Sequence, residues 1–277
     1  MTIKTNILIV GGAGFLGTNL ALKLVKNKKY RVDLLVKDKK KINKALTSTH
    51  CFDCDISRLK DLKKKIKRSY HFVINFSGNI NHGKNTETER VHFSGLKNLI
   101  SIIDKKNLKL FIQTGSSLEY GKMISPQKEK ILCKPISFYG TAKYRASQYI
   151  KKNLKNYLIL RPYQIYGPYQ KMNRLIPMVI NSCLKNKKFN CTDGSQLRDF
   201  LYVDDFSNLL IKIIKKRKFK RKIYNVGYGK PFKVKYVINT ILKIIKRGEP
   251  LFGRVKMRDD EIRKLYPNIS RIKKDLN

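Results

Sequence analysis

The chain has 277 residues, a formal net charge of +43 and five cysteines. This length suffices for one large α/β domain with a smaller lobe, whose core needs neither disulfides nor metal for stability. No run approaches the ~18 uninterrupted apolar residues of a membrane-spanning helix, so we expect no membrane insertion. Cys51 and Cys54 have C-x-x-C spacing, but no second pair accompanies them, and we expect no metal site. The cysteines form no even framework and no signal peptide precedes the first expected strand, so we expect free thiols in the cytoplasm.

The charge raises the question of nucleic-acid binding, because a basic surface attracts any polyanion. However, 47 of the 62 basic residues are lysines, and they occur in nearly every segment. Clusters of arginine with aromatic residues are more typical of proteins that read nucleic acids. We therefore interpret the lysines as solvated helix faces and expect no specific nucleic-acid partner, although the charge favours anionic small substrates.

A glycine-rich turn near the amino terminus is the first candidate site. The apolar run Ile7–Val10 predicts a buried parallel strand, and an amphipathic stretch, Thr18–Lys26, predicts a helix after the turn. Between them, Gly11 permits the turn, Gly14 lets backbone approach a pyrophosphate, and Gly17 lets the helix pack on the strand. Amides at the start of the helix then hold the phosphates. The pattern predicts a dinucleotide site, and the alternative is a turn without a ligand.

Strand and helix patterns alternate after this turn. The expected strands are 31–36, 50–54, 72–76, 110–114 and 157–160, and the expected helices are 59–66, 90–105 and 141–154. This alternation predicts an α/β fold with a Rossmann-like, doubly wound parallel sheet. Ligands of such sheets bind beyond the carboxyl ends of the strands. Polar residues follow several strands there: Asp55, 75–79 and Ser116.

After Arg161-Pro162 the composition shifts toward proline, glycine and aromatic residues. Short strands are expected at 200–203 and 223–226, and helices at 174–185, 204–216 and 234–246. We interpret residues 1–162 as a dinucleotide-binding domain that carries the catalytic residues. Residues 163–277 then form a smaller C-terminal substrate-binding lobe, interleaved with the first domain, which closes over the edge of the sheet.

Tyr139 and Lys143 lie on one face of an expected helix, because they are four residues apart. A phenol is a poor base at neutral pH, but a nearby ammonium stabilises the phenolate and lowers its pKa. Ser116 ends the preceding strand, where its hydroxyl is suited to hold a substrate oxygen in line with the tyrosine. On its own, such a tyrosine–lysine pair usually lies on the protein surface and has no catalytic role. Together with the glycine turn and Ser116, it predicts a catalytic site.

In combination these motifs resemble the extended short-chain dehydrogenase/reductases of the NAD-dependent epimerase/dehydratase family, from about residue 6 to the end. The matching segments are 11–17, Asp55-Ile56, Ser116 with Tyr120-Gly121, Tyr139 with Lys143, 161–168, 193–200 and 202–205. The resemblance implies that Tyr139 is the general acid/base, that Lys143 holds the nicotinamide ribose, and that Ser116 hydrogen-bonds the sugar oxygen. It also implies a nucleotide-sugar substrate and a homodimer.

The same resemblance assigns residues to each ligand. Those implied for the cofactor are Gly11, Gly14, Phe15, Leu16, Gly17, Lys37, Asp55, Ile56, Phe76, Ser77, Tyr139 and Lys143, with Asp55 and Ile56 beside the adenine. Those implied for the substrate are Ser117, Gln164, Arg174, Leu175, Arg198 and Arg258. Of these, Arg198 and Arg258 grip the diphosphate, a role that suits the forked donors of arginine.

The choice between NAD and NADP depends on the end of the second expected strand. An acidic residue ~20 positions beyond the glycine turn accepts the ribose hydroxyls of NAD and repels the extra phosphate of NADP. With 31–36 as that strand, Val36 takes the position and Lys37 follows it. We therefore expect NADP. A strand two residues longer would bring Asp38 into place and favour NAD.

Departures from the family pattern reduce the number of reactions that we expect for this chain. Dehydratases carry an Asp-Glu pair directly after the catalytic hydroxyl, where this chain has Ser117 and Leu118, so dehydration is disfavoured. Relatives usually continue beyond the position of Asn277, and a shortened lobe would weaken the substrate site. Positions that are usually a histidine and two asparagines are here Asn75, His92 and Gln164.

The leading hypothesis is an NAD(P)-dependent epimerase or 4-keto-sugar reductase that acts on a nucleotide-activated sugar, in the synthesis of surface-polysaccharide precursors. Tyr139 moves the hydroxyl proton as hydride passes between a ring carbon and the cofactor. Return of the hydride to the other face gives epimerisation, and loss of the cofactor gives net oxidoreduction. The alternatives are a nucleotide-sugar 4,6-dehydratase and a non-catalytic dinucleotide sensor or RNA-binding relative.

Overall fold

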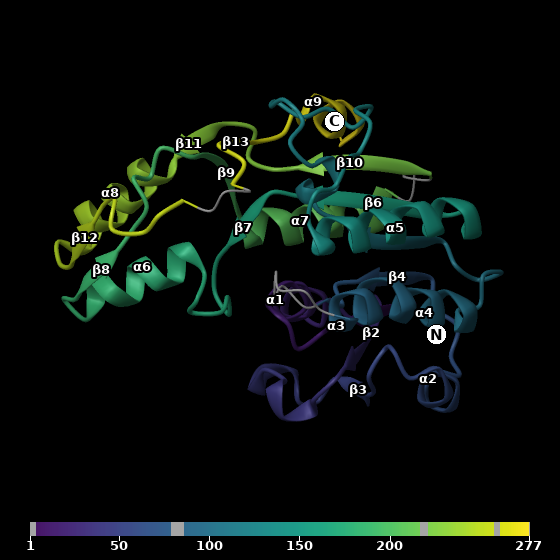
Figure 1. Ribbon diagram of the computed structural model, residues 1–277. Coiled ribbons are helices and arrows are strands. Elements are labelled where there is room, and N and C mark those ends of the chain that lie inside the picture. Colours follow the sequence, from purple (N-terminus) through teal and green to yellow (C-terminus); the bar gives the residue numbers. More distant parts are fainter. Residues whose placement is uncertain (1–3, 79–85, 217–220, 258–260, 277) are drawn as a thin grey trace.

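A sheet of seven parallel strands forms the centre of the molecule (Figure 1), in the order β10-β6-β5-β4-β1-β2-β3. The computed structural model describes residues 4–78, 86–216, 221–257 and 261–276. The strands of this sheet are β1 (Thr5–Val10), β2 (Tyr30–Val36), β3 (His50–Asp53), β4 (Phe72–Asn75), β5 (Leu110–Thr114), β6 (Tyr157–Pro162) and β10 (Lys222–Val226). The strand order reverses between β1 and β4, which is where doubly wound sheets bind their ligands. The Rossmann-like fold expected from the sequence is confirmed.

Helices cover both faces of this sheet. One face carries α1 (Phe15–Leu24), α7 (Val203–Lys216) and α9 (Ser270–Leu276), and the other carries α2 (Leu59–Lys65), α4 (Gly95–Ile102) and α5 (Phe138–Asn153). Within β1, Ile7 and Ile9 join the first of these cores, and Leu8 and Val10 join the second. Because both faces are buried there, the strand is apolar from Ile7 to Val10, as the sequence predicted.

A smaller part of the molecule lies beyond the carboxyl ends of the strands. Its strands are β7 (Gln164–Tyr166), β8 (Lys188–Asn190), β9 (Leu197–Tyr202), β11 (Pro231–Lys233), β12 (Glu249–Leu251) and β13 (Lys264–Leu265), and its helices are α6 (Leu175–Leu184) and α8 (Val234–Ile245). β9 pairs with β7, β11 and β13, while β8 pairs with β12 alone. A small core of Val179, Cys183, Phe189, Cys191 and Ile238 joins α6 to α8.

The chain after residue 162 is shared between these two parts. We expected the strand at 223–226 in the smaller lobe, but β10 pairs with β6 at the edge of the main sheet. Helices α7 and α9 also pack on that sheet. A short apolar run does not specify which sheet it joins, so its partner is fixed only by the tertiary structure. The helix expected at 90–105 likewise differs, because a short α3 (Thr86–Glu89) and a π-helical turn, Arg90–Ser94, lead into α4.

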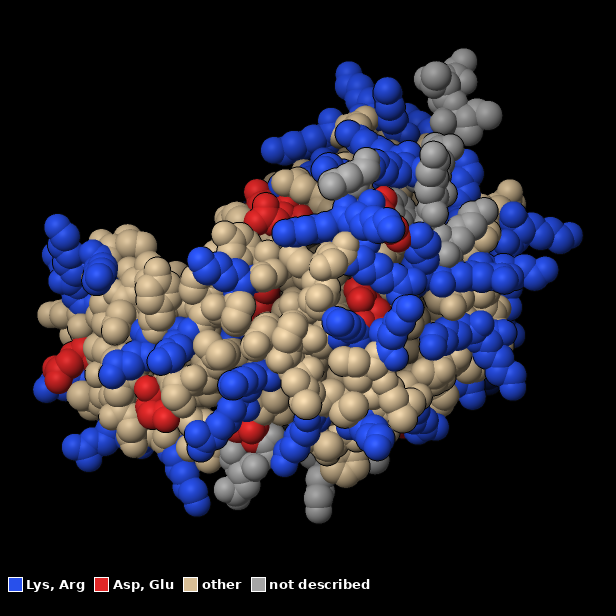
Figure 2. Space-filling model, turned by 90° about the horizontal axis from the view of Figure 1, so that it is seen from above, with Lys and Arg blue, Asp and Glu red and all other residues tan. Residues whose placement is uncertain are grey.

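Lysine and arginine side chains are spread over most of the face seen in Figure 2, with few acidic side chains between them. In the described part of the chain, none of the helices has the length and apolarity to cross a bilayer. The same residues contain no group of three His, Cys, Asp or Glu side chains placed to hold a metal ion.

Candidate active site

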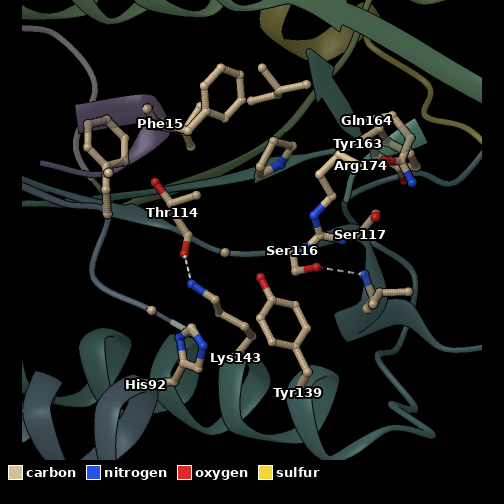
Figure 3. Close-up of a pocket in the computed structure, with 18 of the residues that line it drawn as sticks. Phe15, His92, Thr114, Ser116, Ser117, Tyr139, Lys143, Tyr163, Gln164 and Arg174 are labelled. Atoms are coloured by element: carbon tan, nitrogen blue, oxygen red, sulfur yellow. Dashed lines mark hydrogen bonds between the residues drawn. The ribbon is translucent and has the colours of Figure 1, made fainter. Parts of the chain in front are cut away.

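A cavity of about 740 Å³ opens where β1, β4 and β5 end (Figure 3). It runs from the glycine turn to the smaller part of the molecule, so segments far apart in the sequence form its walls. Its lining includes fourteen of the residues that the sequence predicted: Gly11, Gly14, Phe15, Leu16, Gly17, Phe76, Ser77, Ser116, Ser117, Tyr139, Lys143, Gln164, Arg174 and Arg198.

The glycine turn has the shape that a dinucleotide pyrophosphate needs. Gly11 has a positive φ of 80°, and a Cβ atom at Gly17 would lie 2.3 Å from the carbonyl oxygen of Gly11. The backbone therefore folds tightly against the start of α1. The first turn of α1 contains no acidic residue, and no described side chain caps it at Gly14. Its amides are available to phosphate oxygens, and the helix dipole favours negative charge there.

Ser116 lies between β5 and a 3-10 turn, Ser117–Tyr120. Its Oγ accepts a hydrogen bond from the backbone N–H of Leu118 at 3.1 Å. Its own N–H donates to Oε1 of Glu119 at 2.9 Å, which completes a capping box. Because Oγ accepts from the backbone, Ser116 can donate its hydroxyl hydrogen, and its side chain forms a hydrogen bond with Tyr139.

Tyr139 and Lys143 project from the first turns of α5 toward Ser116 and Thr114 (Figure 3). Ser137 caps this helix, because its Oγ accepts from the N–H of Gly140 at 3.1 Å. The ammonium of Lys143 is buried, donates to the carbonyl oxygen of Thr114 at 2.8 Å, and lies 5.8 Å from the centre of the Tyr139 ring. Strand end and helix start therefore bring the three side chains together.

The ionisation of this pair differs from the sequence expectation. Burial raises the pKa of Tyr139 to about 12, although a hydrogen bond with Ser116 acts in the opposite direction. Burial also lowers the pKa of Lys143 to about 8. We expected Lys143 to lower the pKa of the tyrosine, but the loss of hydration of the buried phenol raises it and is the largest effect. In this state Tyr139 is protonated at neutral pH and is suited to donate a proton.

A sequence model of the NAD dependent epimerase/dehydratase family matches residues 7–227. The chain belongs to this family. It is 30% identical to a Methanocaldococcus jannaschii protein with the provisional name UDP-glucose 4-epimerase, over 96% of this chain and 90% of the relative. It is 26% identical to CDP-abequose synthase of Salmonella muenchen, over 98% and 91% of the two chains.

Solved structures of the family share the fold. The UDP-glucuronic acid 4-epimerase of Bacillus cereus, in complex with a fluorinated UDP-sugar and NAD, superposes with a TM-score of 0.87 at 23% identity, over 98% of this chain and 92% of that one. The similarity thus extends through both parts of the molecule. Members of the family are NAD-dependent enzymes of nucleotide-sugar metabolism, and this chain is an enzyme of that class.

The residues expected at the substrate end lie in different surroundings. Arg198 lines the cavity, forms an ion pair with Glu261 and donates to the carbonyl oxygen of Leu197 at 2.8 Å. Arg174 precedes α6, and its positive charge lowers the pKa of Tyr139, although the effect of burial is larger. Leu175 instead packs on the small core between α6 and α8, away from the lining. Arg258 lies outside the described residues.

The residues expected beside the adenosine lie beyond the cavity lining. The ammonium of Lys37 is 3.5 Å from carboxylate oxygens of both Asp55 and Glu87. Partial burial would raise the pKa of Asp55, but hydrogen bonds from Ser57 and the charges of Lys37 and Arg90 hold it below its ordinary value. Asp38 caps the turn Lys39–Lys41 by accepting from the N–H of Lys40.

Ile56, expected on the other side of the adenine, is buried. It packs close to the start of α4, since a Cβ atom at Gly95 would lie 2.6 Å from its Cγ2.

Sequence reasoning missed several residues of the site. Lys171 and Tyr163 line the cavity, and the carbonyl oxygen of Thr114 holds Lys143. His92, noted only as a departure from the family, packs edge-to-face on Tyr139, with ring centres 5.1 Å apart. Glu119 carried a usable signal, because Ser-x-x-Glu is the pattern of a capping box. The others depend on chain segments that meet only in the folded protein.

Proposed function

We propose that the protein is an NAD(P)-dependent epimerase or ketoreductase acting on a nucleotide-activated sugar. The observation that carries the proposal is the convergence of Ser116, Tyr139 and Lys143 midway along the cavity. The glycine turn lies at one end of this cavity, and Arg174 and Arg198 lie at the other. The smaller part of the molecule would therefore hold the nucleotide diphosphate of the substrate, as in relatives whose names specify UDP- or CDP-linked sugars.

Each residue has a defined task in this reaction. A bound nicotinamide nucleotide supplies or accepts the hydride. The glycine turn and the amides of α1 hold its pyrophosphate, and Lys143 holds its ribose. Ser116 donates a hydrogen bond to the sugar oxygen, and Tyr139 donates a proton to that oxygen as a carbonyl is reduced. In the oxidising direction the phenolate form of Tyr139 accepts the proton, and the positive charge of Lys143 stabilises that phenolate.

Elimination of water is disfavoured by the residues that follow Ser116. A dehydratase needs an acid beside the sugar, but Ser117 and Leu118 occupy the corresponding positions and carry no carboxyl group. Glu119 is buried behind them and does not line the cavity. Among the described lining residues the carboxylate is that of Glu261, which is paired with Arg198.

We further propose that NADP is preferred over NAD. At the end of β2 stand Val36 and Lys37, and the nearby carboxylate of Asp38 is engaged in capping the turn that follows. No carboxylate of the described segment 30–41 is thus offered to the ribose hydroxyls, while the exposed ammonium of Lys37, which also pairs with Asp55 and Glu87 at 3.5 Å, would attract a phosphate. Titration of both cofactors into the protein tests this directly. Tighter binding of NAD would overturn it.

The test of the overall proposal is a panel of nucleotide sugars and their 4-keto forms. Hydride transfer is followed by nicotinamide absorbance, and product stereochemistry separates epimerisation from net reduction. The proposal predicts turnover of at least one UDP-, CDP- or dTDP-linked sugar. Absence of turnover on the whole panel, with retention on RNA that is lost at modest salt, would instead indicate a non-catalytic relative.

A further inference from the structure

A buried ion pair lies directly behind Ser116, outside the cavity. Glu119 is 0% exposed and Arg161, at the end of β6, is 2% exposed. Nη2 and Nε of Arg161 donate to Oε2 of Glu119 at 2.8 and 3.1 Å, and the guanidinium also stacks on the ring of Tyr120, 4.5 Å from its centre. Neither charged residue lines the cavity, so the pair has no direct contact with a ligand there.

The carboxylate of Glu119 is the acceptor of every hydrogen bond described around it. Oε1 accepts from the N–H of Ser116 at 2.9 Å, and Oε2 accepts from the hydroxyl of Ser147 at 2.9 Å as well as from Arg161. A glutamine has the same shape, but its amide nitrogen would face one of these donors. The arrangement is therefore specific for an ionised carboxylate, and Arg161 stabilises that charge in a buried place.

These donors belong to the elements that carry the proposed catalytic groups. Ser116 follows β5, and Ser147 lies on α5, one helical turn after Lys143 and two turns after Tyr139. Gly115 lets the carboxylate come this close, because a Cβ atom there would lie 2.4 Å from Oε1 of Glu119. One carboxylate thus joins the end of β5 to the helix that carries the tyrosine.

We propose that Glu119, held by Arg161, is a positioning residue that fixes Ser116 relative to Tyr139 for hydride transfer. This inference rests on the proposed function. The alternative explanation is that the ion pair has a purely structural role. Buried ion pairs of that kind can often be replaced by apolar residues without loss of stability. The two accounts differ in what an apolar replacement does to turnover.

The experiment compares Glu119→Gln and the double variant Glu119→Leu/Arg161→Met with a matched control, Glu129→Gln. Glu129 is a half-buried glutamate whose carboxylate accepts from the backbone N–H of Asn225, whereas Ser116, Ser147 and Arg161 donate to Glu119. Two measurements are made on each folded variant: steady-state kinetics in the nucleotide-sugar assay, which give kcat and KM, and amide hydrogen exchange over residues 115–121. The double variant avoids an unpaired buried charge and keeps the test open if Glu119→Gln folds poorly.

We expect kcat to fall by about 10- to 100-fold in both Glu119 variants, because small misplacements of a catalytic group have effects of that size. KM should change by less than about twofold, since the arginines proposed to bind the diphosphate are untouched. Exchange at Ser116 should accelerate, because its N–H loses its acceptor. The control should alter none of these quantities.

A folded double variant with wild-type kcat, or unchanged exchange over 115–121 in both variants, would overturn the inference. If the wild-type protein turns over no nucleotide sugar, the proposed function fails by itself. The exchange measurement then still decides whether Glu119 holds Ser116 in place.

Discussion

The two walls of the cavity hold their functional side chains in different ways. On the main sheet, Lys143 is 3% exposed and is bound to the end of β5, and Ser116 is fixed by a capping box. Across the cavity, Arg198 stands on β9 within a sheet of short strands, and Arg174 is half-buried at the start of a helix. The groups proposed for proton transfer thus belong to the main sheet and α5, and we call this side the main-sheet wall. The groups proposed for substrate recognition belong to the smaller part of the molecule, and we call that side the substrate wall.

Replacement of Tyr139 is the strongest test of the main-sheet wall. Tyr139→Phe keeps the ring but removes the hydroxyl group that would donate the proton, so we expect kcat to fall by about 10²–10⁴-fold. Cofactor affinity should stay nearly unchanged, because the glycine turn and Lys143 are intact. Steady-state kinetics and a cofactor titration provide both values. Retention of more than about a tenth of the wild-type kcat would rule out Tyr139 as the acid.

On the opposite wall, Arg198→Ala should act mainly on substrate affinity. Loss of a charged hydrogen bond corresponds to ~1.5–3 kcal/mol, so we expect KM to rise by about 10- to 150-fold with a smaller change in kcat. Arg263→Ala is the matched control, since this exposed arginine lies near β13 and does not line the cavity. Equal KM values for the two variants would show that Arg198 does not bind the diphosphate.

The pH dependence of turnover tests the role proposed for Lys143 on the main-sheet wall. Burial holds the pKa of Lys143 at about 8, so its positive charge is present below that pH and is lost above it. We expect kcat to decline by about tenfold per pH unit above pH ~8, because a neutral amine no longer stabilises the phenolate. In Lys143→Arg the charge persists, and any residual activity should lack this decline. The same decline in the arginine variant would assign it to another group.

Cofactor selectivity should give the smallest effect, because Lys37 is 62% exposed. In Lys37→Glu a carboxylate replaces the cation, so attraction for the NADP phosphate is lost and repulsion is gained. Exposed ion pairs contribute ~0.2–1 kcal/mol, and we expect the ratio of the two dissociation constants to shift toward NAD by about fivefold. Lys40→Glu, on the following turn, serves as the control. An unchanged ratio for Lys37→Glu would remove this residue from the cofactor site.

The sequence predicted the residues of the main-sheet wall better than those of the substrate wall, for a physical reason. The turn at Gly11–Gly17 and the spacing of Tyr139 and Lys143 are local patterns, and their positions follow once a doubly wound sheet is assumed. The pairing of Arg198 with Glu261 and of Glu119 with Arg161 joins distant segments, so no local pattern specifies it. The pKa of Tyr139 was predicted in the wrong direction, because hydration depends on everything that packs around a group.

The late position of β10 in the chain has a consequence for biosynthesis. β6 can pair with β10 only after residues 163–221, which include β7, α6, β8 and β9 of the smaller part of the molecule, have been made. Until then the nascent chain presents the hydrogen-bonding edge of β6 to other chains, and open edges of this kind promote aggregation. The folding of the two parts is therefore linked: the sheet that supports the proposed catalytic groups is completed by a strand that lies, in chain order, between the first and the second half of the smaller part.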